Sequence, residues 1–212
     1  MPHPVSFVVL IAAVVVSVAW RRGMRANRAL ILSACNTVEE VFDPVDKTYT
    51  NIGGSIGYQF THTLEKPFSR IDGTIATVPR QAVLYLPISR ALGREDILQL
   101  TLFCPNLPPG IGHIVESRQL RRGWIVPEET EQMYARTEQL EDMTVVVYYF
   151  NPYVREQLAA RFLEISRRRA FRYLGYYGSY GYVTLRLDPT AADAPELLHD
   201  WRTKMVKLLT ER

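Results

Sequence analysis

The chain has 212 residues, of which 47% are hydrophobic, and its 25 basic and 22 acidic side chains give a net charge of +3. These values are typical of a folded domain and exclude a disordered chain, a collagen-like repeat and a coiled-coil rod. So many charged side chains also exclude a membrane protein with several spans. A charge of +3 is too small to indicate nucleic acid as a partner by itself.

The first 22 residues predict a membrane anchor. Residues 1–20 contain no Asp, Glu, Lys or Arg, and the run from Val5 to Trp20 is apolar apart from two serines. As a helix this run spans about 24 Å, slightly less than a bilayer core of about 30 Å. The aliphatic stems of Arg21 and Arg22 can close most of that gap by snorkelling. We therefore expect a retained transmembrane helix within residues 1–22.

Two other interpretations of this apolar run are less favoured. A cleaved signal peptide needs a basic segment before the apolar run and a small-residue cleavage site after it. Here the first four residues contain no Lys or Arg, and Trp20-Arg21-Arg22 ends the run. A buried core helix would have to be covered by protein on every face.

Four arginines predict the orientation of the anchor. Arg21, Arg22, Arg25 and Arg28 follow the span closely, and no basic side chain precedes it. Positively charged flanks remain on the cytoplasmic side of a membrane. We therefore expect a single-pass protein of the cell membrane, with a short outer N-terminus and a cytoplasmic C-terminal domain. The same arginines could also contact anionic lipid head groups.

Residues 23–44 predict a juxtamembrane helix that ends at Asp43-Pro44. Its apolar side chains recur every three or four residues, at Ile31, Ala34/Cys35, Val38 and Val41/Phe42. We expect this stripe to pack on the domain that follows, with a dimer seam as the alternative.

Residues 45–212 predict an α+β domain. Its first half contains alternating or apolar runs that indicate strands at 55–63, 68–78, 82–88, 96–104 and 112–120. A proline-rich loop at 105–110 could separate two halves that meet near 105–127.

The second half mixes helices and strands. We expect a helix over Glu128–Leu140 and a buried strand over 144–150, followed by a helix that is capped by Asn151 and has Pro152 at its first position. A hairpin over 170–188 is expected to turn in 175–179. A capping box formed by Asp193 and Glu196 indicates the start of a C-terminal helix. The predicted fold class is thus a single transmembrane helix followed by a mainly antiparallel sheet with two or three helices packed on one face.

The sequence shows no motif for a cofactor, a metal or a catalytic centre. The histidines lack metal-ligand spacing, and Cys35 and Cys104 are expected to be small buried hydrophobes. Gly175, Gly178 and Gly181 precede a strand rather than a helix, which favours turn glycines over a phosphate-binding loop. An enzyme with a dispersed site, using a carboxylate with His62, His113 or His199, remains the alternative.

One segment, residues 167–182, combines basic and aromatic side chains. Arg167, Arg168, Arg169, Arg172 and Tyr173 lead into a tyrosine-rich turn. Such a pattern is a candidate contact for anionic lipid or nucleic acid. It is also explained by arginines near a helix C-terminus and by the strand propensity of tyrosine.

Together these observations predict a membrane-anchored protein with a non-catalytic binding or tethering domain at the cytoplasmic membrane face. The expected partners are the lipid bilayer and another protein, and nucleic acid is disfavoured. Anionic lipid or nucleic-acid binding through residues 167–182 is the main alternative function.

Overall fold

The computed structural model describes residues 4–127, 129–141 and 143–210. The chain opens with one continuous 39-residue helix, α1 (Pro4–Phe42), which contains both the apolar run and the segment after it. It ends where predicted, because Asp43 adopts a left-handed backbone with φ of 46° and is followed by a proline.

The first half of the remaining chain forms four strands and one short helix. They are β1 (Asp46–Asn51), β2 (Gly57–Thr63), β3 (Arg70–Ala76), α2 (Tyr85–Ala91) and β4 (Ile97–Phe103). The second half consists of β5 (Ile111–Glu116), α3 (Ser117–Arg121), η1 (Thr130–Gln132), β6 (Tyr134–Gln139), β7 (Thr144–Tyr149), α4 (Pro152–Phe162), η2 (Ile165–Arg167), β8 (Phe171–Tyr177), η3 (Gly178–Tyr180), β9 (Tyr182–Leu187) and α5 (Ala194–Thr210).

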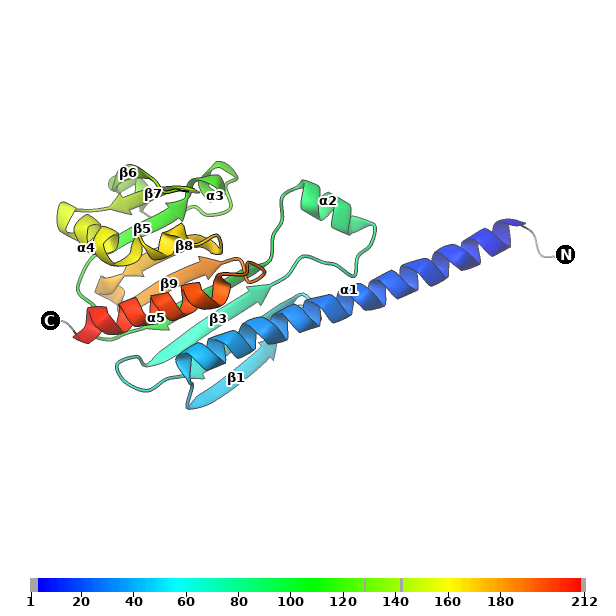
Figure 1. The fold of residues 1–212 in the computed structure, drawn as a ribbon, viewed down its shortest axis with the longest axis horizontal. Coiled ribbons are helices and arrows are strands. Elements are labelled where there is room, and N and C mark those ends of the chain that lie inside the picture. Colours follow the sequence, from blue (N-terminus) through cyan, green and yellow to red (C-terminus); the bar gives the residue numbers. More distant parts are fainter. Residues whose placement is uncertain (1–3, 128, 142, 211–212) are drawn as a thin grey trace.

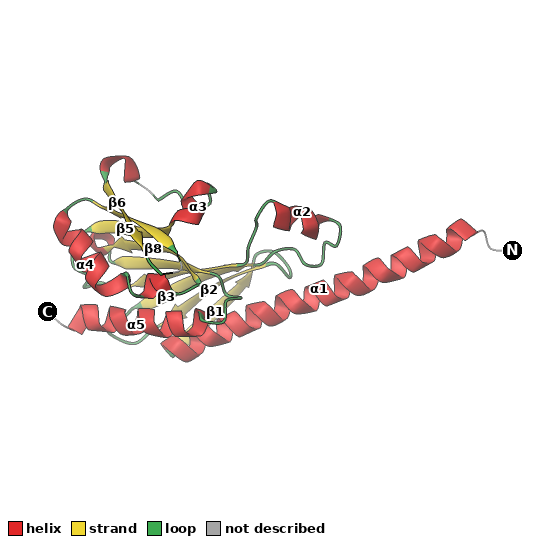
Figure 2. Cartoon of the chain, turned by 45° about the horizontal axis from the view of Figure 1, so that its top comes forward, coloured by secondary structure: helices red, strands yellow, loops and turns green. Residues whose placement is uncertain are grey.

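The nine strands of the described residues belong to one antiparallel sheet in the order β1-β2-β3-β4-β9-β8-β5-β7-β6. The central pair, β4 and β9, joins strands from the two halves of the sequence. Helices α4, α5 and the C-terminal part of α1 cover one face of the sheet (Figures 1 and 2). The predicted fold class, an apolar N-terminal helix followed by an α+β domain with an antiparallel sheet, is confirmed.

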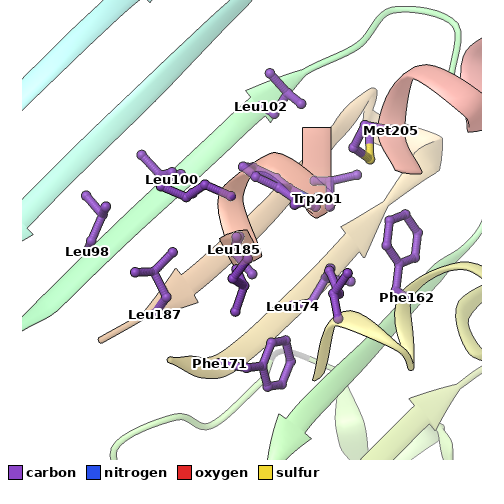
Figure 3. Packing of buried hydrophobic residues seen from close by; sticks show 14 of the residues in the cluster. Leu98, Leu100, Leu102, Phe162, Phe171, Leu174, Leu185, Leu187, Trp201 and Met205 are labelled. Carbon is purple, nitrogen blue, oxygen red and sulfur yellow. The ribbon is translucent and has the colours of Figure 1, made fainter. Parts of the chain in front are cut away.

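The main core lies between this face of the sheet and the helices. Leu98, Leu100 and Leu102 of β4 alternate toward the helices, as the sequence pattern predicts, and they are fully buried. Trp201 and Met205 of α5 pack over them, and Figure 3 shows these side chains together with Phe162 of α4. Asn151 caps α4 as expected, since its side chain accepts a hydrogen bond from the backbone N–H of Val154 at 2.9 Å.

The two ends of α1 have different environments. The predicted stripe of its C-terminal part is buried from Ile31 to Phe42, and Phe42 meets Trp201 edge to face with ring centroids 5.8 Å apart. Packing on the domain is therefore confirmed for this segment. The N-terminal part projects beyond the domain in Figure 1, is long and apolar enough to cross a membrane, and has none of its most apolar window buried. The protein thus carries a membrane-anchor-like helix.

The strand predicted over 82–88 is wrong, because residues 85–91 form helix α2. Pro87 has no N–H group to donate to a sheet, but it is tolerated in the first turn of a helix, where such groups lack partners. Two of the apolar side chains that suggested a strand are exposed, at Leu84 directly before this helix and at Ile88 within it.

The helix predicted over Glu128–Leu140 is also wrong. Glu128 lies outside the described residues, and the remainder forms η1 and the edge strand β6. Every side chain of β6 is at least partly exposed, so neither of its faces carries an alternating apolar pattern.

Smaller differences concern the ends of elements. The strand predicted over 112–120 stops at Glu116 and continues as helix α3. The hairpin between β8 and β9 turns in residues 178–181 rather than 175–179. Strand β1, over residues 46–51, was not predicted, and its side chains are all exposed.

Candidate functional site

A groove lies on the face of the sheet opposite the helices, which we call the open face. Because Leu98, Leu100 and Leu102 point into the core, the side chains between them point to the open face. The groove has a volume of about 450 Å³ and is lined by Gln99, Thr101, Tyr173, Tyr177, Tyr182, Thr184, Arg186 and the loop residues Trp124–Pro127. It is therefore assembled from β4, β8, β9 and the loop after α3.

Neighbouring strands place the polar side chains of the groove side by side. Thr101 of β4 pairs with Thr184 of β9, and their hydroxyl oxygens lie 3.2 Å apart. In the same register, Gln99 pairs with Arg186. The groove thus presents hydroxyl, amide and guanidinium groups within two adjacent strands, which suits a ligand with several hydrogen-bond acceptors.

Tyrosines form the wall of the groove on the side of β8. The Tyr173 hydroxyl lies 3.2 Å from the Tyr177 hydroxyl and 3.1 Å from Nδ1 of the buried His113. The Tyr177 ring also stacks on that of Tyr182 with centroids 4.7 Å apart. These mutual contacts hold the rings in place without a ligand.

Gly175 makes the approach of Tyr173 and Tyr177 possible. A Cβ atom at position 175 would lie 2.3 Å from the Tyr173 hydroxyl and 2.8 Å from a ring carbon of Tyr177. Gly175 lies within β8 and not in the turn, so its interpretation as a turn glycine is wrong. Gly181, in contrast, does have the left-handed backbone of a turn glycine, with φ of 74°.

Arg186 supplies the positive charge of the groove. Its half-buried guanidinium donates a 3.3 Å hydrogen bond to the backbone oxygen of Trp124 and, within the described residues, forms no ion pair. Burial lowers its pKa, although Glu95 opposes that effect through its charge. An arginine remains protonated near neutral pH, so an incompletely solvated positive charge faces the groove.

A second cavity, of about 510 Å³, adjoins the groove on the side of α2. It shares Trp124 and Arg186 with the groove, and Ile56, Val78, Pro79, Tyr85 and Ile97 are among its other lining residues. Thr77 also lines this cavity, and its buried hydroxyl has no hydrogen-bond partner in the structure. The open face therefore combines a polar groove with a more apolar extension.

The segment predicted to contact anions is divided between separate places. Tyr173 lies in the groove. Arg167, Arg168 and Arg169 instead line a surface cavity beside the start of α5 that also contains Glu164, Asp193 and Asp200. The arginines are thus brought together with carboxylates, and the cavity has mixed charge.

Two contacts define that mixed-charge cavity. Arg168 forms a 2.7 Å ion pair with Asp200, and this hydrogen bond raises the Arg168 pKa. Asp193 precedes α5 as an N-cap would, but its carboxylate accepts hydrogen bonds from the backbone N–H groups of Arg169 and Ala170 at 2.6 and 3.1 Å. The expected capping residue therefore ties α5 to the segment before β8.

Arg172 is neutralised within the domain. Its largely buried guanidinium lies 3.2 Å from Glu95, 3.7 Å from Glu116 and 3.0 Å from Asp188. It therefore differs from Arg186 on the neighbouring strand β9, which lines the groove and, within the described residues, forms no ion pair.

The arginines predicted to set the topology, Arg21, Arg22, Arg25 and Arg28, are all exposed on α1 directly after its apolar part. Arg28 also lines a separate groove of about 300 Å³ between α1 and the Tyr49 and Tyr58 side chains of β1 and β2.

The residues of the alternative enzymatic hypothesis do not converge. His62 is buried beside Tyr49 near α1, His113 contacts Tyr173, and His199 is exposed on α5. In the described part of the chain, no three His, Cys, Asp or Glu side chains group as metal ligands would. Cys35 and Cys104 are buried free thiols, and burial raises their pKa values to about 11 and about 12.

Sequence reasoning missed Gln99, Thr101, Trp124 and Arg186. The available signal was the alternation of β9, in which Thr184 and Arg186 occupy the positions that point away from the core. Nothing in the sequence indicates that β9 pairs with β4, and it is this pairing that brings Thr184 and Arg186 next to Thr101 and Gln99.

Comparisons with known proteins add little to this picture. No family model matches the chain, and no curated protein matches it. Among solved structures, a match is the crystal structure of the mycobacterial trehalose monomycolate transport factor A, TtfA, with 9% sequence identity over 77% of this chain and 72% of that chain. Its TM-score is 0.37, which is too low to support an argument about this chain.

Proposed function

We propose that the protein is a single-pass, membrane-anchored binding domain without catalysis of its own, which holds an acidic segment of another protein in the open-face groove. The exposed apolar part of α1 supports the anchor. The arginines directly after it support a cytoplasmic position for the domain, because basic flanks remain on that side. The groove supports binding rather than chemistry, since its polar groups are hydroxyls, an amide and a guanidinium.

The observation that carries the proposal is the environment of Arg186. Bringing a charge out of water is costly unless it is paired, and such groups are usually matched by a carboxylate, as Arg172 is by three. Within the described residues, the hydrogen bond of Arg186 goes to a backbone oxygen, and Glu95 acts on it through its charge without forming an ion pair. A carboxylate on a bound partner would complete its hydrogen bonding in the bidentate geometry that arginine favours.

The remaining lining residues specify the rest of the ligand. The hydroxyls of Thr101 and Thr184 and the amide of Gln99 can bond a peptide backbone, and the stacked Tyr177 and Tyr182 rings offer flat apolar surface. Tyrosine and arginine are enriched where proteins bind one another. The cavity around Arg167, Arg168 and Arg169 is a weaker candidate, because its own carboxylates compete for these cations.

Site-specific photocrosslinking in intact membranes tests this function. The full-length chain would carry p-benzoylphenylalanine in place of Tyr177 in the groove, or in place of the exposed Tyr134 of β6 as the matched control. We expect a protein adduct from position 177 that is lost with Arg186→Gln. The adduct should be retained with Arg118→Gln, which removes an exposed arginine of α3 that does not line the groove. Adducts that are equal at 177 and 134, or unaffected by Arg186→Gln, would contradict the proposal.

A further inference from the structure

The segment that contains α2 is attached to α1 just beyond its apolar part. A Cβ atom at Gly23 would lie 2.3 Å from the backbone oxygen of Arg80. The backbone of α1 is therefore in direct contact with the backbone of the segment before α2, three residues after Trp20. One turn later, the Asn27 side-chain amide donates hydrogen bonds to the backbone oxygen of Val78 at 3.0 Å and to Gln81 at 3.1 Å. The α2 segment is therefore held at the level where α1 leaves its apolar run.

Both ribbon views agree with this placement. In Figures 1 and 2, α2 lies at the end of the domain from which the N-terminal part of α1 projects, apart from the layer formed by α4 and α5. The contacts at Gly23 and Asn27 fix this position. If α1 crosses a bilayer, α2 lies at the surface of that bilayer.

Helix α2 carries an apolar face that the described part of the domain leaves uncovered. Leu84 is 85% exposed, Ile88 55% and Leu92 63%. These residues are spaced by four, and the backbones of Leu84 and Leu92 are also helical, so all three lie on one side of the helix. Large apolar side chains grouped in this way on a surface mark an interaction site.

The charges around this face favour an anionic surface. Residues 79–94 contain three arginines and no Asp or Glu, and Arg90 and Arg94 are exposed. The exposed arginines of α1 that follow Trp20 lie at the same level. Basic and apolar side chains combined on one short helix are typical of segments that lie in the interface of a bilayer with anionic lipids.

We propose that the face of α2 formed by Leu84, Ile88 and Leu92 inserts into the head-group region of the same bilayer that α1 spans. The inference rests on the anchoring part of the proposed function. A single spanning helix leaves a domain free to rotate and tilt, whereas a second contact beside it fixes the face that the domain turns to the membrane. The cavity that adjoins the groove is lined in part by Tyr85 of α2, so the groove is then held at a fixed distance from the lipid surface.

Depth-dependent fluorescence quenching tests this inference with the full chain. Single cysteines labelled with the fluorophore NBD would be placed by Leu84→Cys and Ile88→Cys, in vesicles of phosphatidylcholine and phosphatidylglycerol with or without spin-labelled lipid. Both native cysteines are buried, so the label is directed to the new site. Tyr153→Cys, at an exposed position on α4, is the matched control, and Leu10→Cys reports on the span itself.

We expect quenching by lipids labelled near the head group to be about threefold greater at 84 and 88 than at 153, as for an interfacial helix. Quenching at position 10, together with control-level quenching at 84 and 88, would overturn the α2 inference and leave the anchor intact. Position 10 lies inside the apolar run, so lipids labelled in the acyl chain report on it, and control-level quenching by these lipids at position 10 would overturn the anchor. A blue-shifted signal at 84 and 88 that lipid does not quench would show that protein covers the face, which also overturns the inference.

Discussion

The hydroxyl groups of Tyr173 and Tyr177 lie 3.2 Å apart above Gly175, the residue between them on the same face of β8. In a strand, side chains four positions apart point to the same face and are normally separated by the side chain that lies between them on that face. Here the missing side chain lets the two rings lean together. This pair forms the wall of the groove on which the proposed function depends.

Gly175→Ala should therefore disturb the groove wall. The new Cβ would lie 2.3 Å from the Tyr173 hydroxyl, so at least one ring must move, at a cost of about 1–3 kcal/mol in the free energy of unfolding. Urea denaturation measures this loss. The double variant Gly175→Ala/Tyr173→Phe, which lacks the closest atom, should recover part of it. Equal stability of the single variant and the wild type would show that the glycine is not required.

Asp96 should be important for holding the α2 segment. Its carboxylate, which is 7% exposed, accepts hydrogen bonds from both terminal nitrogens of Arg80 at 2.7 and 2.6 Å and from the backbone N–H of Val78 at 2.9 Å. Asp96→Asn leaves the arginine without its counter-charge and should destabilise the fold by about 3 kcal/mol.

The matched control for this change is Asp72→Asn. Asp72 forms a 3.3 Å pair with Arg70 in which the side chains are 37% and 51% exposed. An exposed pair of this kind contributes less than about 1 kcal/mol. Similar losses for the two variants in chemical denaturation would show that burial does not distinguish these ion pairs.

The native cysteines should be inert in the folded protein. Burial raises the pKa of Cys35 to about 11 and that of Cys104 to about 12, so the reactive thiolate is scarce at pH 7.5. We expect no maleimide labelling of the folded chain and two labelled sites after denaturation. Labelling of both sites in the folded state would contradict the buried positions.

This inertness provides a background for a topology experiment. Glu65→Cys places a thiol on the exposed loop between β2 and β3. If the domain is cytoplasmic, a membrane-impermeant maleimide should label this position only after the cells are opened. Labelling in intact cells would place the domain outside and refute the orientation proposed from the arginines.

Stability should decrease in mild acid through His62. Burial lowers the His62 pKa, an effect reinforced by Lys47 and opposed by Glu39, and the ring contacts the Tyr49 hydroxyl at 3.1 Å. Since the pKa in the unfolded chain is about 6.5, the unfolded state binds more protons than the folded state below that pH. The stabilisation is therefore complete above pH 6.5 and is lost as the pH falls toward the folded pKa.

Denaturation midpoints between pH 5 and pH 7 measure this dependence. His62→Gln should flatten the decline, whereas His199→Gln, at an exposed position on α5, should leave it unchanged. A wild-type slope in the His62 variant would assign the acid sensitivity to other groups.

Elements with one buried side could be predicted from the sequence. The leucines of β4 alternate because one face of that strand meets the core, and α5 repeats its apolar residues because one side of the helix meets the same core. Asn151 and Pro152 marked the start of α4 through local chemistry that needs no distant partner. Elements without a buried side, such as β1 and β6, carry no such pattern and were missed or assigned wrongly.

The apolar run at 82–88 shows that an apolar pattern does not always predict burial. Its composition suggests burial, but its side chains are exposed in α2, and only the contacts at Gly23 and Asn27 show that this helix lies beside the proposed membrane surface. Composition records how apolar a segment is, whereas what covers it depends on where the fold places it.

The sequence by itself determined the apolar N-terminal helix, its basic flank and the class of the domain, because these depend on local composition and on periodicity along the chain. Only the tertiary structure decided the candidate site. The order of strands in the sheet brings Gln99 of β4 beside Arg186 of β9, 87 positions later in the chain, and that pairing has no signature in either strand alone. The tertiary structure also distinguishes Arg172, which is neutralised by carboxylates, from Arg186, which forms no ion pair within the described residues.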